Sequence, residues 1–100
     1  MKLMHYLLDA DHNVVEVPDL LTWARAMETF ERRVAKTEIS ETVEVSTVFL
    51  GLDHNWRAYG PPILFETMVF GGEHNEKMDR YATWDEALSG HAAMVKRCTQ

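Results

Sequence analysis

Apolar and polar positions follow one another along the chain in a way that predicts two strand pairs and two helices. Short apolar runs at 3–8 and 14–17 flank the turn-forming segment 9–13, which favours an N-terminal hairpin. Longer runs at 43–52 and 63–70 are too short and too β-branched for surface helices, so they predict an antiparallel pair of strands. Both faces of the second run are largely apolar, which indicates a central strand covered on two sides.

Helical periodicity occurs in two further segments. Asp19 is a candidate N-cap for a helix that runs to about residue 36. Its apolar stripe, at spacings of three and four residues, consists of Leu20, Trp23, Met27, Phe30 and Val34. Thr83 and Glu86 form a capping box that starts a second helix, from residue 84 to about residue 96.

The segments between these elements are polar. Residues 37–42 are predicted to be a connector, and residues 80–82 a short strand or an extended arm. The predicted fold class is therefore α+β: a two-layer antiparallel sheet with two helices, in the order ββαββ(β)α. One domain is expected to cover residues 1–100, because a chain of this length is near the common size for a single hydrophobic core.

Composition narrows the classes of function. With 16 acidic and 10 basic side chains the net charge is −6, so direct binding of duplex nucleic acid is not expected. A single cysteine, Cys98, excludes an internal disulfide and fits a reducing compartment. No apolar run approaches the ~20 residues of a membrane span, and the start of the chain does not resemble a signal peptide. We therefore expect a soluble cytoplasmic protein without a membrane partner.

The connection between the two long strands carries the first candidate site residues. Asp53 and His54 can bind a ligand or orient a general base, or they can form an Asx turn with an exposed histidine. Trp56, Arg57 and Tyr59 are residue types that anchor interfaces and stack on bases, which indicates a recognition surface. The alternative is that the two aromatic rings fold back as a lid on the core.

Other candidates lie in the second long strand and the last helix. Glu66 stands among apolar residues, so it forms an ion pair, for which Arg80 is one candidate, lies on an exposed edge face, or binds a ligand. The neighbouring Thr67 can donate a hydroxyl from the opposite face. His91 lies on the apolar face of the last helix, as a bonded core histidine or as a ligand. Gly90 before it indicates a close approach of another group to the helix backbone.

Asp53, His54, Glu66 and His91 have side chains that suit a divalent metal ion. None of them shows the local spacing of a metal motif, so a site would depend on the fold bringing them together. Phosphate-loop, dinucleotide-binding and nucleophile-elbow motifs do not occur in the sequence. No metal and no cofactor are predicted.

Three strings together resemble a family of small uncharacterised proteins encoded in bacteriophage and prophage genomes: STVFLGLDH, PPILFETMVFGG and RYATWDEALSGH. The opening HYLLDADHNVVEVPDLLTWA is also similar, so the resemblance covers most of the chain. It implies a phage origin and the host cytoplasm, but no activity. The chain differs from the glycine-rich loop of the family at residues 55–59, so the resemblance implies no role for that loop.

The sequence therefore favours a small non-catalytic binding protein of phage origin, a host-defence antagonist that binds a host protein or sequesters a nucleotide signal. A homodimer is the default oligomer. The alternative is a small metal-dependent enzyme that uses Asp53, His54, Glu66 and His91. The candidate ligand-binding residues are Asp53, His54, Trp56, Arg57, Tyr59, Glu66, Thr67, Arg80 and His91.

Overall fold

The computed structural model describes residues 4–100. In chain order its elements are β1 (Tyr6–Leu8), β2 (Val14–Glu16), α1 (Leu20–Thr29), β3 (Arg33–Glu38), β4 (Glu44–Phe49), β5 (Phe65–Phe70), β6 (Met78–Tyr81) and α2 (Trp84–Cys98). Leu3, the first residue of the first predicted strand, lies outside the described residues. The predicted α+β class, with antiparallel pairing and two helices, is confirmed.

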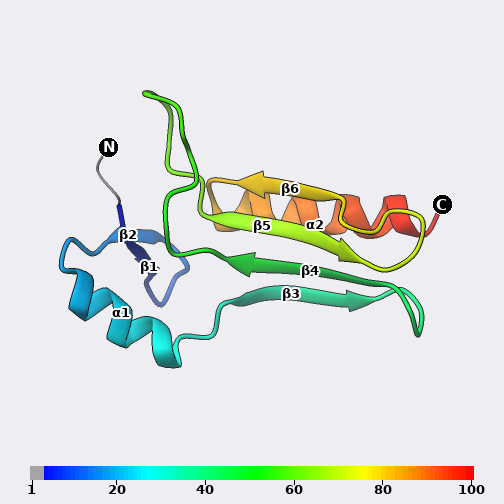
Figure 1. The fold of residues 1–100 in the computed structure, drawn as a ribbon, viewed down its shortest axis with the longest axis horizontal. Coiled ribbons are helices and arrows are strands. Elements are labelled where there is room, and N and C mark those ends of the chain that lie inside the picture. The colour runs from blue at the N-terminus through cyan, green and yellow to red at the C-terminus, as the bar shows by residue number, and fades with distance from the viewer. Residues whose placement is uncertain (1–3) are drawn as a thin grey trace.

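The strands form two antiparallel sheets rather than the single sheet that was predicted. β1 and β2 form a two-stranded hairpin, and β3–β4–β5–β6 form a four-stranded sheet in sequence order. In Figure 1 the hairpin and α1 lie beyond the end of the large sheet where β4 finishes and β5 begins. A single bridge between His5 and Leu52 ties the hairpin to the chain that leaves β4.

The prediction that the first helix reaches residue 36 was wrong. α1 ends at Thr29, and residues 33–38, expected to be helix and connector, form strand β3 along β4. Val34 packs against the core from this strand, which places it on the same side as the apolar helix positions. The apolar spacing of the helix therefore runs on into a strand. Pairing with β4 outweighs the helical periodicity of the local sequence.

Helix α2 covers one face of the four-stranded sheet, and the core lies between them (Figure 1). Buried residues of β4 and β5 pack here with buried residues of the helix: Val45, Phe49, Phe65, Val69, Ala87 and Met94. The capping box predicted for α2 is present, with Thr83 as N-cap and Glu86 as its partner. The core therefore lies on one side of the large sheet.

The opposite face of the large sheet is uncovered, contrary to the prediction that the central strand is covered on two sides. We call this surface the open face; it consists of the residues of β3–β6 that alternate with the buried positions. No helix or strand of residues 4–100 lies over it in Figure 1. Phe70 and Met78 on this face are 49% and 40% exposed.

Within the described residues, neither helix is long and apolar enough to cross a membrane.

Candidate functional site

The structure separates the nine predicted site residues into two groups on opposite sides of the large sheet. Residues of the loop 53–63 gather with Arg80 and Glu66 beside the open face. Thr67 and His91 lie on the covered side, between the sheet and α2. The predicted residues therefore form a loop cavity and a separate buried network rather than one site.

Asp53 closes the base of the loop 53–63. Its Oδ1 accepts hydrogen bonds from the backbone N–H of Asn55 at 2.7 Å and of Ile63 at 2.9 Å, so it fastens both ends of the loop. The Asx-turn interpretation is therefore correct for this residue. Asn55 continues the bonding: its Nδ2 donates to the carbonyls of Tyr59 and Pro61, and its Oδ1 accepts from the Arg57 N–H. These bonds give the loop a defined shape.

His54 has a fixed ring orientation at the edge of the loop. Its Nδ1 lies 2.8 Å from the carbonyl oxygen of Leu52, which can only accept, so Nδ1 carries a proton. In the neutral ring Nε2 is then an acceptor, and in the charged ring a second donor. The ring lies near Trp56, with centroids 5.7 Å apart and an interplanar angle of 53°.

The loop and β6 border an open cavity of about 420 Å³, which we call the loop cavity. Its lining includes the side chains of His54, Trp56, Arg57, Tyr59, Ile63 and Arg80. Trp56 and Tyr59 are 62% and 74% exposed, so the interpretation of these rings as a lid on the core is wrong. Among residues 4–100, the lining contains two guanidinium groups and no carboxylate. The volume falls within the range of small-molecule sites, roughly 300–1,000 Å³.

Arg80 and Glu66 form a cross-strand ion pair next to the loop cavity. They are direct partners in the β5–β6 register, and Arg80 Nε lies 3.0 Å from Glu66 Oε2. The pair explains how a carboxylate is tolerated in the apolar strand β5. Because the bond uses Nε, the two terminal nitrogens of the guanidinium are left for other acceptors.

His91 is the centre of a buried polar network between the large sheet and α2. Its Nε2 lies 2.8 Å from Thr37 Oγ1 and its Nδ1 lies 2.7 Å from Thr47 Oγ1; Thr47 in turn bonds the Thr67 hydroxyl. The side chain is 7% exposed, and burial lowers the pKa of His91. The interpretation as a bonded core histidine is therefore correct, and Thr67 shares that structural role.

Gly90 allows the close approach that the sequence indicated, and the approaching group is the ring of Tyr81 on β6. A Cβ at position 90 would lie 2.1 Å from Tyr81 Cζ. The Tyr81 hydroxyl is buried and, within the described part of the chain, meets no partner in hydrogen-bonding geometry. Burial raises its pKa, and the nearby Thr67 hydroxyl opposes that rise only in part.

The four residues considered as metal ligands do not come together. Glu66 lies on the open face, and His91 lies behind the sheet with both ring nitrogens bonded to threonines. Asp53 is used in fastening the loop. In the part of the chain that the structure describes, no group of three or more His, Cys, Asp or Glu side chains is placed to hold a metal ion.

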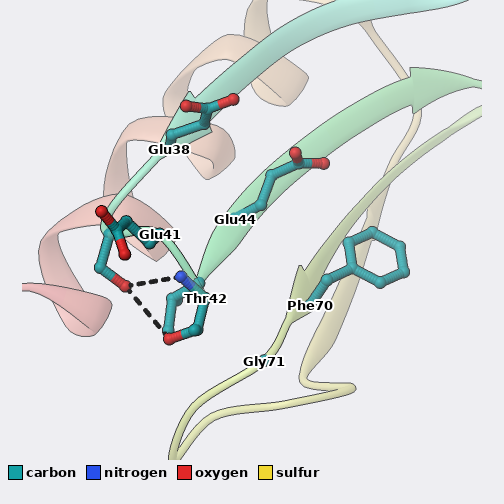
Figure 2. A pocket seen from close by; sticks show the side chains of 8 residues that line it. Glu38, Glu41, Thr42, Glu44, Phe70 and Gly71 are labelled. Carbon is teal, nitrogen blue, oxygen red and sulfur yellow. Dashed lines mark hydrogen bonds between the residues drawn. The ribbon is translucent and has the colours of Figure 1, made fainter.

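Two features went unnoticed in the sequence. His12 stacks on Trp84, with centroids 3.7 Å apart and planes 3° apart, although 72 positions separate them in the chain. At the far end of the open face, a cavity of about 410 Å³ is lined by Glu38, Glu41, Glu44 and Phe70, as Figure 2 shows. We call this region the acidic end. Glu38, Glu41 and Glu44 fall within seven positions of the sequence, but only the pairing of β3 with β4 places them around one cavity with Phe70.

Replacing Asp53 with alanine is expected to loosen the loop 53–63. The substitution removes the acceptor of two backbone N–H groups, and the loss is expected to cost about 1–3 kcal/mol in the free energy of unfolding. Hydrogen exchange measured by mass spectrometry should show faster exchange at the amides of Asn55 and Ile63. Asp53→Asn keeps Oδ1 and serves as the control. Equal exchange in Asp53→Ala and the wild type would contradict the fastening role.

The geometry of the loop cavity is the guide to function, because it brings together most of the predicted ligand-binding side chains. A scan against protein-family models, a search of curated proteins and a search of solved structures each found no match to this chain.

Proposed function

We propose that this chain is a small non-catalytic binding protein whose loop cavity holds a nucleotide. One observation carries the proposal: Arg57, Arg80 and the imidazole of His54 line a cavity together with two aromatic rings, in a chain whose net charge is −6. A cationic, aromatic lining on an acidic protein favours a ligand that combines negative charge with a flat ring.

The chemistry of the lining suits the two parts of a nucleotide. Trp56 and Tyr59 offer exposed rings on which a base can stack, and such stacking contributes about 1–3 kcal/mol per base. Guanidinium groups bind phosphate through paired N–H donors, and Arg57 and Arg80 supply them. His54 adds one further polar group at the edge of the cavity, because Nε2 of the neutral ring can accept a hydrogen bond from the ligand.

The non-catalytic part of the proposal is supported by how the acid–base groups are engaged. Asp53 fastens the loop, Glu66 pairs with Arg80, and His91 is bonded within the core. Each of these groups therefore has a structural partner that accounts for its position. A protein that binds without turnover fits this arrangement.

We further propose, from the resemblance to phage-encoded proteins, that the ligand is a nucleotide signal of the host, removed from solution by binding. Sequestration requires affinity and a fixed site, and no chemical step. The self-bonded loop supports this, because a loop held in its bound shape loses less conformational entropy when the ligand enters.

Calorimetric titration with adenosine monophosphate as the probe tests the proposal. We expect saturable binding to the wild type, with affinity reduced about tenfold or more in Trp56→Ala, through lost stacking, and in Arg57→Gln, through the lost charge. Leu21→Ala, at an exposed position on α1, is the matched control and should bind as the wild type does.

The titration is repeated with guanosine, cytidine and uridine monophosphates. No heat of binding with any of the four, or equal binding by the wild type and both loop variants, would contradict the proposal. If the wild type then captures a host protein and Trp56→Ala does not, the same loop recognises a protein instead.

A further inference from the structure

The open face of the large sheet has the composition of an interface. Strands β4 and β5 place Val48, Met68 and Phe70 on it, and β6 adds Met78. Phe70 and Met78 are 49% and 40% exposed, and no element of residues 4–100 covers them. These apolar side chains lie among charged and polar ones, Lys36, Glu38, Glu44, Ser46, Glu66 and Arg80. Exposed apolar side chains gathered on one face are typical of an interaction surface.

Charged residues on the open face are arranged by sign along the strands. At the acidic end, Glu38 and Glu44 are direct partners in the β3–β4 register. Lys36 Nζ lies 3.8 Å from Glu38 Oε1 and 3.2 Å from Glu44 Oε1. Figure 2 shows Glu44 on the strand next to Phe70, with Glu38 on the strand beyond it and Glu41 in the connection between β3 and β4. At the opposite end, Arg80 is paired with one carboxylate, Glu66. One end therefore has excess negative charge, and the other presents a guanidinium with free donors.

We infer that the open face is the interface between two copies of this chain, packed sheet against sheet. A two-fold axis that lies between the sheets and runs diagonally across the strands brings the acidic end of each copy, on β3 and β4, to Arg80 on β6 of its partner, so the same favourable contact is made twice. The resulting assembly has four layers, helix–sheet–sheet–helix, with the two sheets about 10 Å apart.

The carboxylates at one end of the open face and the guanidinium at the other favour a second copy as its partner. The chain has a net charge of −6, so copies repel one another across most of their surfaces. On the open face the carboxylates are partly neutralised by Lys36 and Arg80 within each copy. The face is therefore where two acidic chains can approach with least repulsion, and its two ends attract each other. This inference does not rest on nucleotide binding.

Analytical ultracentrifugation of the full chain without nucleotide tests the interface. At high protein concentration the wild type is expected to sediment with twice the 11.6 kDa mass of one chain. Phe70→Glu adds a carboxylate to the row of Glu38 and Glu44 and should weaken dimerisation about tenfold or more. Leu21→Glu, at a 64% exposed position on α1, should dimerise as the wild type does.

Dilution of the wild type, followed by amide chemical shifts, provides a test that does not depend on a variant folding. Shifts that change on dilution should cluster at β3–β6, at residues such as Ser46, Met68 and Met78. A wild type that remains monomeric at every concentration would overturn the inference. So would a dimer that Phe70→Glu leaves intact, or dilution shifts confined to the N-terminal hairpin and α1.

Discussion

Gly90→Ala is expected to destabilise the protein by about 3 kcal/mol, although alanine is the better helix former. The added methyl group would lie 2.1, 2.2 and 2.3 Å from Cζ, Oη and Cε1 of Tyr81. The ring cannot move freely, because it is packed between β6 and α2 with its hydroxyl buried. Urea unfolding followed by circular dichroism measures the change in the free energy of unfolding.

Two further variants separate the steric effect from a general effect on α2. Ser89→Ala, at the exposed position next to Gly90, should change the free energy of unfolding by less than about 0.5 kcal/mol. In a protein that already carries Tyr81→Leu, Gly90→Ala should lower the free energy of unfolding by less than it does in the wild type, because the clash with the ring is absent. A stabilisation of about 1 kcal/mol by Gly90→Ala, the value of helix propensity alone, would contradict the packing described.

His91→Leu is expected to cost about 2–4 kcal/mol in the free energy of unfolding. Leucine fills much of the space but leaves the Thr37 hydroxyl without its histidine partner and Thr47 with only Thr67. Thr37 is half-buried and Thr47 fully buried, so hydration does not replace the lost bonds in full. Thermal and urea unfolding of the variant measure this loss.

The same histidine should make stability depend on pH. Burial holds the pKa of His91 below its ordinary value of 6.5, so between the two values the unfolded chain binds a proton that the folded chain does not. The free energy of unfolding therefore falls as the pH drops below 6.5, by at most about 1.4 kcal/mol per pH unit, until the folded-state pKa is reached. Above pH 6.5 this contribution is constant.

Unfolding of the wild type and of His91→Leu at a series of pH values from 7.5 to about 5 isolates the contribution of this residue. The difference in stability between the two proteins should shrink as the pH falls, because only the wild type loses the histidine contribution. Parallel pH profiles would contradict the assignment of a depressed pKa to His91.

Local signals in the sequence were sufficient for most of the fold. The capping box at Thr83 and the β-branched runs around Val45 and Val69 are properties of neighbouring residues, so they were readable without knowledge of the fold. Strand β3 was missed because Val34 continues the spacing of the helix stripe, and only the pairing with β4 shows that it belongs to a strand. The open face was missed because both faces of β5 are apolar in sequence.

The loop cavity was predictable because its parts are close in the chain. Trp56, Arg57 and Tyr59 fall within four positions, and only Arg80 joins them from a distance. The sequence could not separate His91 and Thr67 from this group, since strand and helix periodicity do not say which face of the sheet is covered. The His12–Trp84 stack joins two distant segments and had no local signal.

A titration of the ¹⁵N-labelled protein with adenosine monophosphate, followed by its three tryptophan indole signals, tests the central claim most directly. Trp23 donates its indole N–H to the carbonyl of Tyr6, Trp84 is stacked on His12, and Trp56 lines the loop cavity. We predict a saturable shift of the Trp56 signal, with the Trp23 and Trp84 signals unchanged. An unchanged Trp56 signal, or a shift confined to Trp84, would contradict a nucleotide site in the loop cavity.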